Sequence, residues 1–157
     1  MSLRASALLT LAICAGPCAA QSNLGLNVYG LSYHLDREEA KSRGHDNEVN
    51  PGLGLRYRVP GEKFDTFLDG GAYRDSGRST AAYGSVGVFW KPTERLRLGG
   101  AMGVFNSDSY NNGDPFIAPV PLAAYEWRRV TLNVVYVPKI DSIGTPDTLG
   151  FWLTLWP

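Results

Sequence analysis

The sequence predicts an all-β fold: an eight-stranded antiparallel up-and-down β-barrel that spans a membrane. Three observations predict it. Apolar residues recur with a period of two, the alternating segments are about 9–12 residues long, and the links between them alternate between long and short. Helical periodicity is poor, and no stretch after residue 20 is long and apolar enough for a spanning helix.

Residues 1–20 have the order of a secretory signal peptide. Arg4 supplies a positive charge, residues 5–15 are mostly apolar, and small residues follow up to Ala20. The apolar stretch is shorter than the roughly 20 residues of a spanning helix, although a short anchor kept on the mature protein is the alternative. We expect cleavage after Ala20 and a single barrel domain over residues 21–157.

The composition excludes several kinds of chemistry. Both cysteines, Cys14 and Cys18, lie in the expected signal, so the mature chain has no disulfide or thiolate metal site. The 15 basic and 15 acidic residues balance, which gives no support for nucleic-acid binding. We expect neither a nucleic-acid partner nor a cofactor.

Strand signals run from one end of the mature chain to the other. In residues 130–136 one parity holds Val, Leu, Val and Tyr while the other begins with Thr and Asn, as in a strand with two different faces. A soluble β-sandwich or a lipocalin-like barrel is the alternative, but shorter strands are usual there. The expected strands are 24–35, 48–59, 64–74, 79–90, 95–106, 116–127, 130–138 and 148–156.

Aromatic residues lie near the strand ends, as in the two interfacial girdles of a membrane barrel. They are equally compatible with an ordinary core. The residues concerned are Tyr33, Tyr57, Tyr73, Trp90, Phe105, Trp127, Tyr136 and Trp156.

Link length indicates the orientation. The links at 60–63, 91–94 and 128–129 are short, those at 36–47, 106–115 and 139–147 are long and polar, and the one at 75–78 is intermediate. Outer-membrane barrels have short periplasmic turns and longer external loops. We therefore expect a barrel in the bacterial outer membrane with both chain ends on the periplasmic side. We also expect a monomer.

The expected topology brings three candidate catalytic residues together. His34 is expected where the first strand reaches the external rim, and Asp75 and Ser76 where the third strand reaches it. An imidazole can take a hydroxyl proton while a carboxylate orients the ring. The alternative is that Asp75-Ser76-Gly77 is only a tight turn. His45, with Asp46 and Glu48 nearby, is interpreted as part of a solvated loop, and we expect no metal site.

Several blocks, in order and spacing, resemble the lipid A palmitoyltransferase (PagP) family. The similarity covers most of the mature chain, and no single block is diagnostic. The blocks are Ser32-Tyr33-His34, the Asn47-Glu48 to Leu55 stretch, Tyr73-Arg74-Asp75-Ser76, Trp90-Lys91-Pro92 with residues 96–99, Pro121-Leu122-Ala123, and residues 130–138.

The resemblance implies an acyltransferase that moves a palmitoyl-like chain from a phospholipid donor to a lipid A acceptor in the outer leaflet. It implies His34, Asp75 and Ser76 as the catalytic trio. Pro121 and Pro138 would weaken strand pairing for lateral lipid entry, because proline cannot donate a ladder hydrogen bond; strand termination is the alternative. Pro51 would do the same on the other side of the barrel.

The chain also departs from the family pattern. The amphipathic helix before the first strand is missing, and Tyr29 stands where the family has a proline. Candidates for the pocket floor are Gly84, Ser85 and Gly87; small interior residues Gly99, Ala101 and Gly103 would leave room for an acyl chain. Candidate phosphate-binding residues are Arg37, Lys41, Arg43, Arg74 and Arg78.

Two other functions remain open. A lipid A or phospholipid acyl hydrolase would use the same trio with water as the acceptor. A structural or adhesive outer-membrane barrel would need none of the three residues.

Overall fold

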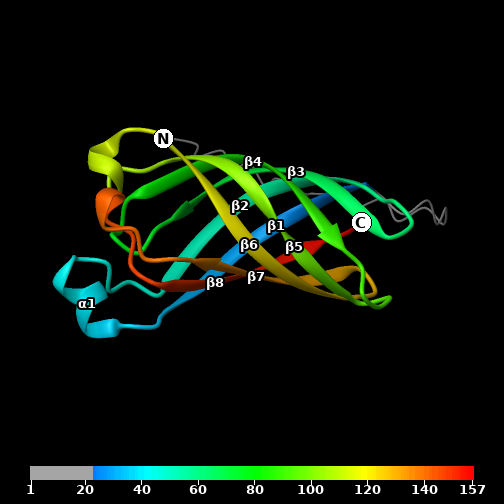
Figure 1. Cartoon of the computed structure of the whole chain (residues 1–157), viewed down its shortest axis with the longest axis horizontal. Helices are drawn as coiled ribbons and strands as arrows, with labels where there is room; N and C mark the ends of the chain where they lie inside the picture. Colours follow the sequence, from blue (N-terminus) through cyan, green and yellow to red (C-terminus); the bar gives the residue numbers. More distant parts are fainter. Residues whose placement is uncertain (1–22) are drawn as a thin grey trace, which may run out of the picture.

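The computed structural model describes residues 23–157, so the expected signal peptide and its cleavage site lie outside the described residues. Each strand pairs antiparallel with its neighbour in the chain, and β1 pairs with β8 to close the barrel (Figure 1). The predicted fold class is confirmed, and each expected strand agrees with the structure to within about one residue at either end. The strands are β1 (Leu24–His34), β2 (Val49–Val59), β3 (Phe64–Arg74), β4 (Thr80–Trp90), β5 (Leu96–Asn106), β6 (Phe116–Trp127), β7 (Val130–Val137) and β8 (Thr148–Leu155).

The long and short connections lie at opposite ends of the barrel (Figure 1). The connections 35–48, 75–79, 107–115 and 138–147 form what we term the loop end. Those at 60–63, 91–95 and 128–129 form the turn end.

Short helices lie in three of the long connections: α1 (Arg37–Ser42), η1 (Asn111–Gly113) and η2 (Asp141–Ile143). The sequence predicts none of them. The Asp36 side chain caps α1 by accepting the Glu39 backbone N–H at 2.9 Å. This cap is a local contact, and a helix of six residues is too short to show an apolar period in the sequence. Within residues 23–157, no helix is long and apolar enough to cross a membrane.

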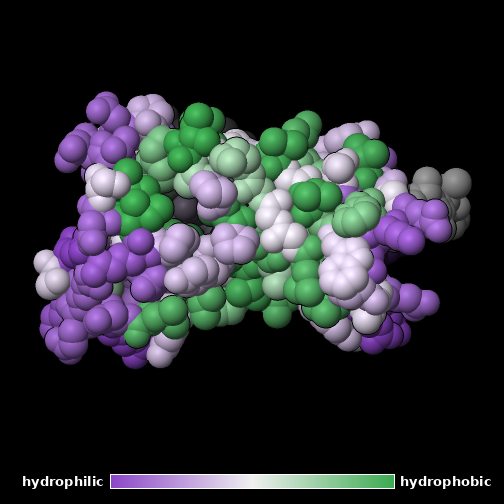
Figure 2. Space-filling view, viewed as in Figure 1, coloured by the Kyte–Doolittle hydropathy of each residue, from purple (hydrophilic) through white to green (hydrophobic). Residues whose placement is uncertain are grey.

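The outer face of the barrel is apolar around its middle. Large hydrophobic side chains from all eight strands are exposed there, among them Leu26, Leu53, Leu68, Val86, Met102, Ile117, Leu132 and Leu153. Figure 2 shows this band between a strongly hydrophilic loop end and a more mixed turn end. A water-soluble monomer rarely exposes so much contiguous apolar surface, whereas a barrel in lipid requires it. The surface agrees with the expected location in the bacterial outer membrane.

Aromatic residues near the strand ends fall into two groups. Tyr33, Tyr57, Trp90 and Trp127 face outward and are about half exposed, as expected for interfacial girdles. The girdle interpretation is wrong for Tyr73 and Phe105, which line an internal cavity, and for Trp156, which is buried. Their strand parity directs them inward.

Polar side chains fill the barrel interior from about its middle toward the turn end. Arg56 donates to both carboxylate oxygens of Asp69, at 2.8 and 2.6 Å, and to Asn133 at 2.7 Å. Thr154 links Asn133 to Asn27, at 2.9 and 2.7 Å. Because these buried groups are paired, the network satisfies charges that would otherwise be costly to bury.

An aromatic layer packs beside this network. The rings of Phe67 and Phe89 are stacked with centroids 4.8 Å apart, and the Arg56 guanidinium lies 4.5 Å from the Phe67 centroid. Ala101 and Leu122 complete the apolar layer. Closer to the turn end, Glu126 binds Arg58 and Arg97, while Asp65 binds Lys91 and Arg97. The interior is therefore densely filled on the turn side of the barrel, and the hollow part lies toward the loop end.

Candidate active site at the loop end

A break in the strand register directs His34 into the barrel. On β1, Asn27 and Tyr29 face inward, and continued alternation would also place Leu31 and Tyr33 inside. The pairing of β1 with both neighbours shifts between Tyr29 and Leu31, so the parity changes there. Leu31 and Tyr33 are consequently exposed outside, whereas His34 is only 1% exposed.

The structure brings His34 and Ser76 together. The Nε2 atom of His34 lies 3.1 Å from the Ser76 hydroxyl oxygen. Both side chains are buried, and Ser76 also lines the main cavity. A hydroxyl bonded to an imidazole beside an apolar cavity has the arrangement needed for proton removal by a general base.

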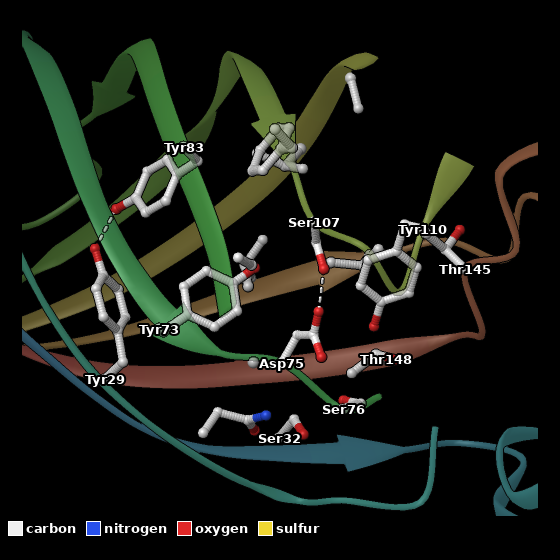
Figure 3. Close-up of a pocket in the computed structure, with 18 of the residues that line it drawn as sticks. Tyr29, Ser32, Tyr73, Asp75, Ser76, Tyr83, Ser107, Tyr110, Thr145 and Thr148 are labelled. Atoms are coloured by element: carbon white, nitrogen blue, oxygen red, sulfur yellow. Dashed lines mark hydrogen bonds between the residues drawn. The ribbon is translucent and has the colours of Figure 1, made fainter. Parts of the chain in front are cut away.

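Asp75 is near this pair but faces a different set of partners. Its carboxylate accepts a hydrogen bond from the Ser107 hydroxyl (Figure 3). It also accepts one from the Ser109 hydroxyl at 3.0 Å and one from the Ser79 backbone N–H at 2.9 Å. The structure therefore places all three predicted residues at the loop end, but it does not pair the Asp75 carboxylate with His34. Asp75 instead ties the 75–79 turn to the 107–115 loop.

Glu48 occupies the place beside His34 that the sequence assigned to Asp75. Its Oε1 atom lies 3.7 Å from His34 Nδ1, and its carboxylate accepts two hydrogen bonds from Arg37, at 3.2 and 3.0 Å. A carboxylate on that side favours a proton on Nδ1 and leaves Nε2 free to accept one from Ser76. In the sequence Glu48 stands beside His45 and in the Asn47-Glu48 to Leu55 block, and no local signal identifies its contact with His34.

Asn47 joins the first loop to the 75–76 turn. Its backbone N–H donates to the Ser76 carbonyl at 3.2 Å, and its side chain donates to the Asp75 carbonyl at 3.1 Å. Gly77 follows Ser76, and a Cβ at that position would collide with the Ser109 side chain. The turn can therefore approach the 107–115 loop closely only with glycine there.

His45 and Tyr110 form a stacked pair behind the turn. Their ring centroids are 4.8 Å apart and the ring planes differ by 13°. Burial lowers the pKa of His45, and the nearby Asp75 carboxylate opposes this shift. His45 is only 6% exposed, so the expectation of a solvated residue is wrong, and its stacking on Tyr110 makes it part of the loop packing. Among residues 23–157, no group of three or more His, Cys, Asp or Glu side chains is placed to hold a metal ion.

An internal cavity of about 190 Å³ lies under the loops. Its wall is mainly apolar and includes Phe105, Phe116, Val120, Val135 and Phe151, while Ser76 and Tyr110 are at its loop side (Figure 3). Such a wall suits a hydrocarbon chain better than a polar substrate.

Tyrosines border the cavity on the side of the filled half. The hydroxyl groups of Tyr29 and Tyr83 are hydrogen-bonded to each other, and the Tyr29 ring lies 5.4 Å from the Tyr73 ring (Figure 3). Gly54 and Gly71 make room for the Tyr29 hydroxyl, since a Cβ on either would press against it.

The small residues proposed from the sequence have different positions. Ser85 and Ala101 line the cavity. Gly87 faces the Phe67 ring, and Gly103 faces the Phe105 ring. Gly84 and Gly99 are exposed and do not line the cavity.

The barrel wall is unpaired beside this cavity. β6 pairs with β7 only from Leu122–Val135 to Trp127–Val130, so residues 116–121 of β6 have no β7 partner. Pro119 and Pro138 border the cavity here, and Pro121 is the first unpaired residue of β6. The molecular surface has a hollow on this face, toward the loop end (Figure 2).

On the other side, β1 and β2 pair up to Leu31–Val49 with a register shift between Tyr29 and Leu31, and the unpaired stretch at Asn50 and Pro51 is shorter than that of β6. The expectation of an opening is thus met beside Pro121 and Pro138 and not at Pro51.

Most of the proposed phosphate-binding residues already have acidic partners. Arg37 pairs with Glu48, Arg43 with Glu39 and Asp141, and Arg78 with Asp46. Within the described part of the chain, Lys41 and Arg74 form no ion pair. Both are exposed at the loop end.

No protein-family model matches the chain, and no curated protein matches it in sequence. Among solved structures, the chain resembles the Yersinia pestis outer membrane protein Ail in a phospholipid bilayer nanodisc. The TM-score is 0.52 and the identity 11%, over 87% of this chain and 100% of that chain. At this identity the likeness shows the fold alone, and that fold is an eight-stranded barrel of a type present in outer membranes.

Proposed function

We propose that the chain is an outer-membrane lipid acyltransferase that moves a fatty acyl chain from a phospholipid to lipid A. The single observation that carries the proposal is the Ser76–His34 hydrogen bond of 3.1 Å at an apolar cavity. The resemblance in motifs to the lipid A palmitoyltransferase family supports the choice of donor and acceptor. The unpaired wall between β6 and β7 supports entry of a lipid from the side.

In this scheme the donor chain lies in the cavity with its ester at Ser76. His34 Nε2 takes the hydroxyl proton as Ser76 Oγ bonds to the ester carbonyl carbon, and it returns that proton to the departing alcohol. An acceptor hydroxyl then attacks the acyl-serine and gives its proton to His34. Ser76 recovers its proton as the new ester leaves, so atoms and charges balance.

Four charged side chains support this chemistry. Glu48 holds the imidazole and stabilises its protonated form, and Asp75 positions Ser76 by holding the turn. Arg74 and Lys41 are the cations available for lipid phosphates.

A hydrolase is the second candidate, because the Ser76–His34–Glu48 arrangement would act equally well with water as the acceptor. Product analysis separates the two. Lipid A that gains an acyl chain supports transfer, and a lipid that loses one without a matching gain supports hydrolysis.

The test is mass spectrometry of phospholipid and lipid A incubated with wild-type protein, Ser76→Ala and Ser42→Ala. Ser42 lies on α1 and is exposed, so its variant is a matched control. We expect acylated lipid A with wild type and Ser42→Ala, and a loss of product of at least about a hundredfold with Ser76→Ala. No product from the wild type would favour the structural or adhesive barrel, and equal products from all three would remove Ser76 from the mechanism.

A further inference from the structure

Two polar side chains in the cavity wall have atoms that no group in the described chain satisfies. They are the hydroxyl oxygen of Ser32 on β1 and the amide oxygen Oδ1 of Asn50 on β2. Both residues line the same cavity as Ser76, and Ser32 is labelled near Ser76 in Figure 3. The catalytic scheme above uses neither of them.

The orientation of the Asn50 amide is fixed by its other atom. Its Nδ2 donates to the Arg74 carbonyl oxygen at 3.0 Å, so Oδ1 is the acceptor that remains. Asn50 is 7% exposed, which removes bulk water as an easy partner. The contact with Arg74 also places Asn50 beside the residues that lead into Ser76.

Ser32 lies beside Asn50 across the first strand pair. Its backbone N–H donates to the Glu48 carbonyl at 3.0 Å, two residues before Asn50. Both residues line the cavity, next to the point where the β1–β2 register shifts between Tyr29 and Leu31. The two unsatisfied atoms therefore belong to one part of the wall.

The chemistry of these atoms restricts what binds there. An unsatisfied buried acceptor costs free energy, and only a group with an O–H or N–H can relieve it. Ester oxygens are acceptors and cannot bond to Asn50 Oδ1. A charged donor is disfavoured by the apolar wall around it.

We propose that Ser32 and Asn50 form a subsite for an uncharged hydrogen-bond donor, a hydroxyl or an amide N–H, carried by the lipid whose ester lies at Ser76. The subsite deepens the proposed function and rests on it for the position of the ester. It selects acyl groups with a hydroxyl near the carboxyl end, or amide-linked lipids, over plain acyl esters.

Binding to the Ser76→Ala protein in micelles tests this without turnover. The probes are methyl 3-hydroxytetradecanoate and methyl tetradecanoate, which differ only in the hydroxyl. We expect the hydroxylated ester to bind roughly three- to tenfold more tightly, the range of one neutral hydrogen bond. The NMR signal of the Asn50 side-chain amide should shift only with the hydroxylated probe.

Asn50→Leu, made in the same Ser76→Ala background, should abolish this preference and leave the affinity for methyl tetradecanoate within about twofold. Ser85→Ala, a change elsewhere in the cavity, should keep the preference. If Asn50→Leu does not fold, as judged by its thermal melting, Ser32→Ala replaces it, with a partial loss expected.

Equal affinities for the two probes, as expected if water alone occupies the subsite, would overturn the proposal. A preference that survives both substitutions, or no binding of either ester, would overturn it as well. The lipid product assay tests the proposed function separately. If no product forms, the acyltransferase proposal is wrong, but a measured preference for the hydroxylated ester still supports the subsite.

Discussion

The Ser76 hydroxyl and the His34 imidazole lie 3.1 Å apart although 42 positions separate them in the chain. The contact depends on two strands that reach the same end of the barrel and on the register shift in β1 that turns His34 inward. Around it, the Glu48 and Asp75 carboxylates contact different groups, and a cavity and an unpaired part of the wall lie next to it. Each of these features can be tested separately.

Glu48 should matter more for the chemical step than Asp75. Glu48→Ala removes the carboxylate 3.7 Å from His34 Nδ1, and we expect a single-turnover cleavage rate lowered by about tenfold or more. Asp75→Asn weakens the bonds to Ser107 and Ser109, so its main effect should be on thermal stability, by roughly 1–3 kcal/mol. Rates and melting curves of both variants decide this; a larger rate loss for Asp75→Asn would contradict it.

The lateral gap should control access of long lipids. Ala118 lies on the unpaired half of β6 and lines the cavity, so Ala118→Phe should obstruct it. We expect at least about a tenfold loss in cleavage of long-chain lipid, while cleavage of 4-nitrophenyl acetate stays within about twofold. Ala123→Phe, on the paired half of β6, is the control. Equal losses on both substrates would point to damaged catalysis instead of blocked entry.

Breaking the buried Arg56–Asp69 pair from one side should destabilise the fold strongly. Asp69→Ala leaves the Arg56 charge unpaired in the interior, and we expect a loss of about 3–5 kcal/mol in the free energy of unfolding. The double variant Arg56→Met with Asp69→Leu should recover much of it, because an apolar pair leaves no uncompensated charge. Urea unfolding in lipid vesicles measures both, and no recovery in the double variant would argue against this account.

Docking of the loops should weaken in acid because of His45. Burial lowers its pKa in the folded protein, whereas an undocked histidine has a pKa of about 6.5. The folded loops therefore bind fewer protons, so the stabilisation is complete above about pH 6.5 and is lost as the pH falls through the lower pKa of the folded state.

His45→Phe keeps a ring against Tyr110 but cannot be protonated. The protection of residues 107–115 against proteolysis should decline between pH 7.5 and 5 more in the wild type than in His45→Phe. An identical decline in both proteins would assign the effect to other groups.

The strands were predictable because the period of two is visible within each strand and the alternation of link lengths is visible along the chain. The inward turn of His34 was not, since it depends on a register shift near Gly30 that changes the parity of every later residue in β1. The partners of Asp75 were missed for a similar reason: Ser107 and Ser109 are 32 and 34 positions away. Glu48 comes beside His34 only when the first loop folds. The sequence therefore located the site but did not show which of its residues contact one another.

The dense packing on the turn side has a consequence for the cell that carries this barrel. Arg56, Phe67 and the ion pairs around Glu126 occupy the interior between the cavity and the turn end. The described strands therefore enclose a blind well, not a conduit, and a lipid tail entering it has no way through. Under the proposed function, a lipid therefore enters the cavity from the side without a path forming along the barrel axis, and the permeability barrier of the membrane is kept.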